Sequence, residues 1–190
     1  SMNNLIRYDI ELFFKINRQW HNAFLDWILP LLRNQYFWSP LYLFTVVFIL
    51  LNFKKKGFAW IAFFLITFAL TDMVSSSLIK PWVGRLRPCA DPYLADSVRQ
   101  VVGCGGPYSF TSSHATNHFG MAMFAFKTLL FIPLAWRWVL FAWAFAISYA
   151  QVYVGVHFPL DIACGALLGC TIGMGTAWAF NKKAGLPTLA

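Results

Sequence analysis

Charge is scarce in this 190-residue chain, since only 12% of its residues are Asp, Glu, Lys or Arg. A soluble domain ordinarily carries about 25%, and half of that amount does not cover a surface that faces water. An ordinary soluble globular domain is therefore excluded. Intrinsic disorder is excluded as well, because 59% of the residues are hydrophobic and disordered chains are poor in apolar residues. The composition predicts an integral membrane protein.

Acidic residues are the rarer charged class, with seven Asp and Glu against fifteen Lys and Arg and a formal net charge of +8. In so apolar a chain, basic residues indicate anchoring beside a membrane rather than nucleic-acid binding. No nucleic-acid partner is expected. Ser1 is interpreted as a cloning remnant before Met2, and no cleavable signal peptide is recognised after it.

Five apolar stretches are long enough to span a bilayer, which takes about 20 residues. Because lipid offers no hydrogen-bond partner to backbone N–H and C=O groups, each stretch is expected to be a helix. They cover residues 34–53, 57–79, 115–136, 138–156 and 162–181. The expected fold class is all-α: a polytopic membrane helix bundle with about five spanning helices plus N-terminal interfacial helices.

The N-terminal part is expected to lie in the membrane interface. In residues 5–17, apolar side chains recur at helical spacing, while Arg7, Glu11 and Lys15 form a ladder on another face, which is typical of an interfacial amphipathic helix. Residues 23–32 are apolar but too short to span. Residues 2–190 are expected to form one domain, with interfacial helices in 2–33, the spanning bundle in 34–181 and an outer loop in 80–114.

Basic residues also predict the orientation. Residues 54–56, Arg137 and residues 182–183 join or follow the spans on one side, and the positive-inside rule makes that side cytoplasmic. The opposite side, expected to be the periplasmic or extracellular side of a bacterial inner membrane, nevertheless carries four basic residues: Lys80, Arg85, Arg87 and Arg99. An anionic ligand explains such a group, whereas Arg99 alone is interpreted as a solvated loop residue.

Three short segments of the outer side carry groups suited to phosphoryl transfer: residues 80–88, 109–114 and 153–161. A phosphoryl group in transfer spreads negative charge over its oxygens, which Lys80 and Arg87 can neutralise. The second segment opens the third span, and Ser112 with the backbone N–H groups that follow it lies at a helix start, where anions bind.

The two histidines in these segments, His114 and His157, can divide the covalent chemistry. One can attack phosphorus while the other protonates the leaving oxygen. Asp161 follows His157 by four residues and is expected about one turn into the last helix. It can accept a hydrogen bond from one ring nitrogen of His157 and leave the other nucleophilic.

Together, Lys80-x6-Arg87-Pro88, Ser112-Ser113-His114 and Gly155-x-His157-x3-Asp161 resemble the three signatures of the type 2 phosphatidic acid phosphatase (PAP2) superfamily. The resemblance covers 80–161 and implies a lipid phosphatase of the membrane branch. It implies that His157 forms a phosphohistidine, that His114 is the general acid and that Asp161 orients His157. Phosphate would be held by Lys80, Arg87, Ser112 and the Ser113 amide. No metal or other cofactor is implied.

The chain departs from the family pattern at two places. Ser113 stands where the family usually has glycine, and Ala150-Gln151 stands where it usually has Ser-Arg. Gln151 can donate a hydrogen bond to the substrate but brings no charge, and losing a transition-state donor typically costs about 2.7–4 kcal/mol. Arg85 is a hypothetical replacement for that charge, and a non-catalytic relative stays open as an alternative.

The lipid substrate is the least determined feature. Undecaprenyl diphosphate is favoured because the compact chain resembles bacterial undecaprenyl-diphosphate phosphatases. Phosphatidylglycerophosphate, phosphatidic acid and lipid A 1-phosphate are the alternatives, since all present a phosphate on an apolar anchor. A lipid phosphotransferase, or an anion-binding or transport protein, would use the same basic groups, and the oligomeric state is left open.

Four further features lead to structural interpretations. Cys89 and Cys104 both lie in the outer loop, where an oxidising compartment permits a disulfide, and we hypothesise that they are bonded. A glycine stripe in 165–173 at four-residue spacing predicts close internal helix packing. Asp72 is expected to hydrogen-bond Ser75 or Ser76, and His118 is interpreted as structural.

Overall fold

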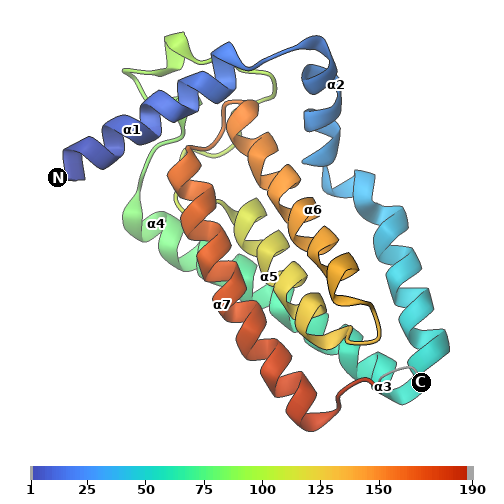
Figure 1. Ribbon diagram of the computed structural model, residues 1–190. Coiled ribbons are helices and arrows are strands. Elements are labelled where there is room, and N and C mark those ends of the chain that lie inside the picture. Colours follow the sequence, from blue (N-terminus) through green and yellow to red (C-terminus); the bar gives the residue numbers. More distant parts are fainter. Residues whose placement is uncertain (1, 188–190) are drawn as a thin grey trace.

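The structure, a computed structural model, describes residues 2–187 and is built from helices (Figure 1). Within that range no strand occurs, only an isolated antiparallel bridge between Leu86 and Tyr108. The all-α fold class is therefore confirmed. The α-helices are α1 (Met2–Phe14), α2 (Ala23–Leu32), α3 (Ser39–Asp72), α4 (Lys80–Val83), α5 (Ser113–Thr128), α6 (Leu134–Tyr153) and α7 (Pro159–Lys183).

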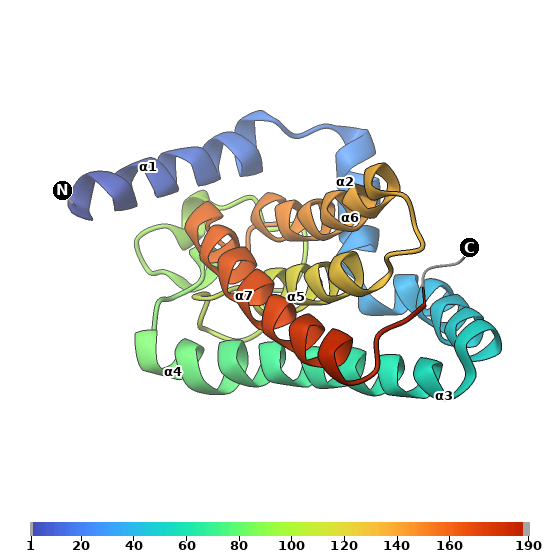
Figure 2. The same cartoon turned by 60° about the horizontal axis from the view of Figure 1, so that its bottom comes forward.

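Helix α5 is the centre of the bundle and packs against α3, α6 and α7 (Figures 1 and 2). Small residues allow this closeness, as the glycine stripe predicts. A Cβ atom added at Gly169 of α7 would lie 2.9 Å from the backbone nitrogen of Gly120 in α5. Since real Cβ atoms do not approach backbone so closely, the stripe serves internal helix packing.

The first two predicted spans belong to one long helical stretch that turns back at Lys54, where φ is 48° (Figure 1). The break falls in the lysine run 54–56, as expected for a link between spans. By length and hydropathy, two helical stretches among the described residues are suited to crossing a membrane: Gln35–Val83 and α7. The number of five spans stays a prediction.

The third and fourth predicted spans are divided at a different point from the one expected. Helix α5 ends at Thr128 rather than at residue 136, and α6 begins at Leu134 after Pro133. Proline fixes its own φ and lacks an N–H, so it favours the position just before or at a helix start. Arg137 therefore lies inside α6, where its Nη1 donates to the Phe126 carbonyl at 2.8 Å, and not in a link between helices.

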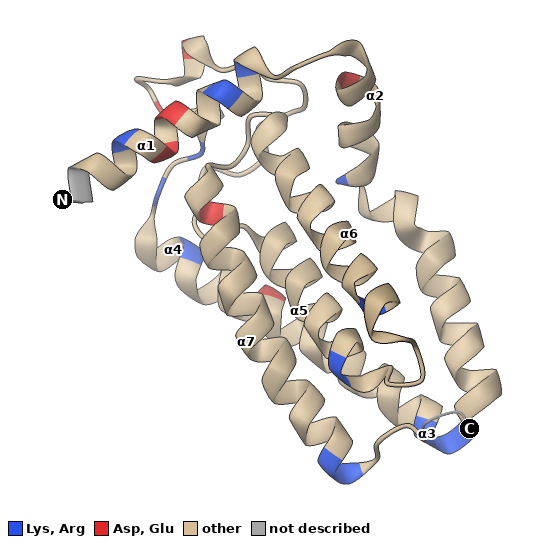
Figure 3. Ribbon diagram, in the orientation of Figure 1, with Lys and Arg blue, Asp and Glu red and all other residues tan. Residues whose placement is uncertain are grey.

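Basic residues gather at the end of the bundle where α7 finishes and α3 bends (Figure 3). Lys182 and Lys183 occupy the last turn of α7, and Lys127 occupies the last turn of α5. Asn181 ties these two ends together by donating to the Lys127 carbonyl at 3.0 Å. The three predicted basic groups thus lie on one side of the molecule.

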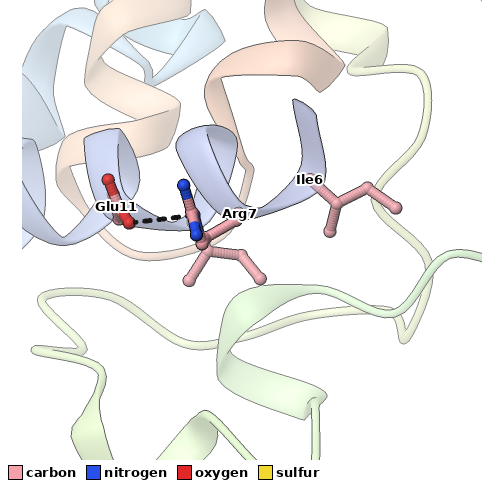
Figure 4. A pocket seen from close by; sticks show the side chains of 4 residues that line it. Ile6, Arg7 and Glu11 are labelled. Carbon is pink, nitrogen blue, oxygen red and sulfur yellow. Dashed lines mark ion pairs between the residues drawn. The ribbon is translucent and has the colours of Figure 1, made fainter. Parts of the chain in front are cut away.

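At the opposite end, α1 lies across the bundle and α2 runs beside α6 (Figures 1 and 2). The apolar face of α1 is anchored by Phe13, which is fully buried beside Phe158 at 5.4 Å between ring centroids. Its outer face keeps the predicted Arg7–Glu11 pair at 3.5 Å. With Ile6 and Ile10, this pair lines an open surface pocket of about 330 Å³ (Figure 4). The structure therefore confirms an amphipathic N-terminal helix.

The loop between α4 and α5 covers this same end and is closed by the hypothesised bond between Cys89 and Cys104, whose Cα atoms are 5.9 Å apart. Arg99 of this loop is not solvated as expected. It pairs with Asp26 of α2 at 2.8 Å and donates from Nε to the Asn17 carbonyl at 2.9 Å. The reason is tertiary: the loop folds back onto the N-terminal helices, which a local pattern does not show.

Candidate active site

His157 lies in the tight turn that joins α6 to α7, and its side chain is only 2% exposed. The turn is held by the Gln151 carbonyl, which accepts from the His157 N–H at 3.2 Å. Burial lowers the pKa of His157 to about 4, although the nearby Asp161 acts in the opposite direction. At neutral pH the ring is therefore uncharged, which is the form that can attack an electrophile.

Asp161 sits in the first turn of α7, where local capping aims its carboxylate back at the turn. Its Oδ2 accepts from the Phe158 N–H at 2.8 Å, and Pro159 begins the helix. The same oxygen is 3.5 Å from His157 Nδ1. This distance exceeds a normal hydrogen bond, but such contacts often tighten only when substrate binds. The two groups are together, as the four-residue spacing predicts.

Arg85 binds Asp161 rather than compensating for the missing arginine at position 151. Its Nη1 donates to Asp161 Oδ1 at 2.8 Å, and its Nη2 donates to Asp9 of α1 at 2.6 Å. Both carboxylates are buried, with side-chain exposures of 0% and 2%. Asp9 also accepts from the Leu160 N–H at 2.7 Å. Arg85 thus links helix α1 to the start of α7, a role that the sequence did not suggest.

The start of α5 lies directly beside the start of α7. The Ser112 N–H donates to the Asp161 carbonyl at 3.1 Å, and the Ser112 hydroxyl caps α5 by accepting from the Ala115 N–H at 3.4 Å. His114 therefore occupies the first turn of α5 at the same end of the bundle as His157. The free N–H groups of a helix start favour an anion at this place.

Lys80 is positioned by a chain of side-chain hydrogen bonds. Its Nζ donates to Ser113 Oγ at 2.8 Å, and that hydroxyl also bonds Ser76 Oγ at 2.7 Å. Ser76 in turn donates to Asp72 at 3.4 Å, as expected, and Asn117 donates to the same carboxylate at 3.0 Å. Serine in place of the family's glycine is thereby explained, because its hydroxyl holds the ammonium group of Lys80.

Arg87 is held by the disulfide-closed loop. Its Nη1 donates to the Cys104 carbonyl at 2.6 Å and its Nε to the Tyr108 carbonyl at 3.1 Å. Burial lowers the pKa of Arg87, but an arginine stays protonated in proteins. Lys80 and Arg87, which come from one segment, are therefore both fixed cations near the two helix starts.

Gln151 is fully buried in the last turn of α6, and its neighbour is a residue that sequence reasoning missed. Arg33, at the C-terminal end of α2, donates from Nε to Gln151 Oε1 at 3.3 Å. The two positions are 118 residues apart in the chain, and no motif includes Arg33, so no local signal points to it.

His118 packs under His114. Its Nδ1 is 2.7 Å from the His114 carbonyl, and its ring meets Trp143 edge to face at 4.9 Å between centroids. These contacts agree with the structural interpretation. Among residues 2–187, no group of three or more His, Cys, Asp and Glu side chains is arranged to hold a metal ion.

The chain is similar in sequence to a family model and to several known proteins. The PAP2 superfamily model matches residues 58–184. A lipid A 4′-phosphatase of Bacteroides thetaiotaomicron is 34% identical over 166 residues, which cover 84% of this chain and 70% of that protein. An undecaprenyl-diphosphatase of Sulfolobus acidocaldarius is 32% identical over 177 residues, covering 88% and 76%.

A solved structure agrees in fold. The transmembrane PAP2 type phosphatidylglycerolphosphate phosphatase of Bacillus subtilis superposes with a TM-score of 0.70 at 22% identity, covering 95% of this chain and 88% of that one. At this identity the likeness concerns the fold. It extends over the N-terminal helices as well as the bundle.

Proposed function

Because this chain is a membrane lipid phosphatase that belongs to the PAP2 superfamily, we propose that it removes phosphate through a phosphohistidine formed on His157. The carrying observation is the junction of α5 and α7, where the Ser112 N–H meets the Asp161 carbonyl at 3.1 Å. That junction brings the segments of His114 and His157 together at one end of the bundle. The family resemblance gives the two histidines complementary roles.

In the proposed first step, His157 Nε2 attacks phosphorus while the phosphorus–oxygen bond to the lipid breaks. His114 gives its proton to the departing oxygen. Asp161 accepts from His157 Nδ1 and stabilises the positive charge that develops on the ring. In the second step, His114 takes a proton from water, the water oxygen attacks phosphorus, and the bond between nitrogen and phosphorus breaks to release inorganic phosphate.

The phosphate is held, in this proposal, by Lys80, Arg87, Ser112 and the Ser113 amide. Lys80 is supported in place by Ser113 Oγ and Arg87 by the loop carbonyls. Fixed cations stabilise the transition state because they need no rearrangement as charge spreads over the phosphoryl oxygens. Gln151 adds a neutral donor beside them.

For the substrate, we propose a phosphate monoester on a lipid of the lipid A class, in place of the undecaprenyl diphosphate favoured by the sequence. The support is the relative from Bacteroides thetaiotaomicron, a lipid A 4′-phosphatase that is 34% identical. Undecaprenyl diphosphate is the second candidate, supported by the Sulfolobus relative at 32% identity. Both present phosphate on an apolar anchor that can approach from the bilayer.

For the location, we propose the bacterial inner membrane with the site on the periplasmic side. The gathering of basic residues at the far end of the bundle supports this orientation, because such residues favour the cytoplasmic side. Exposed aromatic side chains on α2, such as Phe24 and Trp27, suit the membrane interface.

The test is phosphate release by purified protein in detergent, without added metal, from lipid A, undecaprenyl diphosphate, phosphatidylglycerophosphate and phosphatidic acid. We expect His157→Ala to abolish release from every lipid that the wild type cleaves. His21→Ala is the matched control, because His21 is exposed and lies outside the site. Unchanged turnover by folded His157→Ala protein would refute the assignment. The preferred lipid in the panel decides between the two substrates.

A further inference from the structure

Position 151 lacks the positive charge that the family usually has there. The family usually has an arginine there, whereas this chain has a glutamine that is 0% exposed. A phosphoryl-transfer site gains much of its rate from fixed positive charge. A neutral residue at this place would weaken the site unless another cation is close by.

Arg33 brings such a cation from outside the family motifs. Its Nε lies 3.3 Å from Gln151 Oε1. Burial, with a smaller contribution from the nearby charge of Arg87, lowers the pKa of Arg33. The residue precedes the segment matched by the family model, which begins at residue 58. Arg33 is therefore contributed by the N-terminal helices, not by the shared motifs.

The C-terminal end of α2, which carries Arg33, is held firmly in place. Trp38 Nε1 donates to the Leu32 carbonyl at 2.7 Å, one residue before Arg33. The Trp38 ring meets Trp143 of α6 edge to face at 5.7 Å between centroids, and Trp143 also contacts His118. These contacts hold the end of α2 against α6, and the hydrogen bond to Gln151 Oε1 positions the guanidinium group there.

The Gln151 amide is oriented by the same contact. A guanidinium only donates hydrogen bonds, so Oε1 must face Arg33 and Nε2 must face away from it. Nε2 is buried and has no hydrogen-bond partner among the described residues. A buried donor without a partner costs about 1–3 kcal/mol, which indicates that a ligand acceptor completes it. The Gln151 carbonyl accepts from the His157 N–H, so this donor belongs to a residue in contact with the nucleophile's turn.

We propose that Arg33 and Gln151 together replace the family's arginine, with Arg33 supplying the positive charge and Gln151 Nε2 donating to a phosphate oxygen. The inference rests on the proposed function and adds a residue to its phosphate site. It also makes the interfacial helix α2 part of the active site, so that the N-terminal region is needed for catalysis and not only for membrane attachment.

The test compares Arg33→Ala, Gln151→Arg and the double variant Arg33→Ala/Gln151→Arg. We expect Arg33→Ala to lower kcat/KM about 10²–10³-fold, the usual effect of losing one transition-state donor. The double variant should recover most of that loss, because it restores a guanidinium at the family position. Gln151→Arg alone should bring no gain, because two guanidinium groups would then repel each other. Arg7→Ala, an exposed arginine on α1, is the control and should match the wild type.

A second readout does not depend on turnover. Inorganic phosphate is titrated against each variant in detergent, and its binding is followed by the rise in thermal stability. We expect weaker phosphate binding in Arg33→Ala and recovery in the double variant. Wild-type kcat/KM in Arg33→Ala, or a double variant no better than Arg33→Ala in both assays, would overturn the inference. Neither result affects the proposed function, which fails instead if the wild type releases no phosphate from any lipid of the panel.

Discussion

Asp9 of α1 is expected to stabilise the fold strongly, because it ties this helix to the catalytic turn through Arg85 and the Leu160 N–H. Asp9→Ala removes the carboxylate that accepts from Arg85 Nη2 at 2.6 Å and from the Leu160 N–H at 2.7 Å. The Asp9 side chain is 2% exposed and that of Arg85 23%. Breaking a buried pair by removing one partner costs about 3–5 kcal/mol. Arg85 keeps Asp161 as a partner, so we expect a loss near the lower figure.

The matched control lies on the same helix. Glu11→Ala breaks the Arg7–Glu11 pair, whose side chains are 63% and 54% exposed at a distance of 3.5 Å. Such exposed pairs contribute about 0–1 kcal/mol. The two substitutions therefore make the same change in charge in two environments, and only the buried one should matter strongly. Asp9→Asn should be intermediate, because its oxygen can still accept from the Leu160 N–H.

The assay is unfolding in mixed micelles with increasing denaturing detergent, followed by the fluorescence of the nine tryptophans. Phosphate release is measured in parallel under native conditions. We expect Asp9→Ala to unfold at lower denaturant and to lose activity, since Arg85 then no longer ties α1 to the start of α7. Equal unfolding midpoints for Asp9→Ala and Glu11→Ala would refute the reasoning.

Three further outcomes are expected. Because burial lowers the pKa of His157 to about 4, the ring stays neutral above that pH and the acid limb of kcat/KM should fall well below pH 6.5; a midpoint at 6.5 would contradict the buried, neutral nucleophile. Ser113→Ala removes the acceptor of Lys80 and should lower kcat/KM about tenfold or more in steady-state assays with unchanged folding, whereas an effect under twofold would exclude this support. Replacing Cys89 and Cys104 by serine should lower the free energy of unfolding by about 3 kcal/mol for a separation of 15 residues and raise KM; an unchanged unfolding midpoint in the same micelle assay would contradict it.

Local patterns predicted those parts of the structure that depend on neighbours in sequence. The proximity of His157 and Asp161 follows from one helical turn, and the amphipathic face of α1 follows from its periodicity. The disulfide between Cys89 and Cys104 was foreseen because both cysteines lie in one loop. The all-α fold class was predictable from composition, because a chain with so little charge and so many apolar residues is expected to cross the membrane as helices.

Contacts between distant segments were not predictable in the same way. Arg99 was interpreted as solvated and instead pairs with Asp26, because the outer loop folds onto α2. Arg85 was considered a substitute for the charge absent at position 151 but instead joins Asp9 to Asp161. Arg33 belongs to no motif at all. Each of these depends on how α1 and α2 lie across the bundle, which hydrophobic periodicity does not determine.

The end of α5 was also misplaced, for a related reason. Residues 129–136 are apolar, so hydropathy alone continued the span beyond Thr128, where the helix ends. Pro133 was the available signal, since the residue before a proline is biased away from helical backbone. That signal ends the helix at or before Ile132, which is closer to the observed end at Thr128 than residue 136 is.

The most direct measurement is to trap the phosphorylated enzyme. Wild-type protein is mixed with lipid substrate carrying radiolabelled phosphate, quenched within one turnover in alkali, digested and sequenced by mass spectrometry. A label that is stable in alkali, labile in acid and located on His157 is the predicted result, with none in His157→Ala. Turnover accompanied by a label on any other residue, or by direct water attack with no labelled protein at any time, would contradict the account.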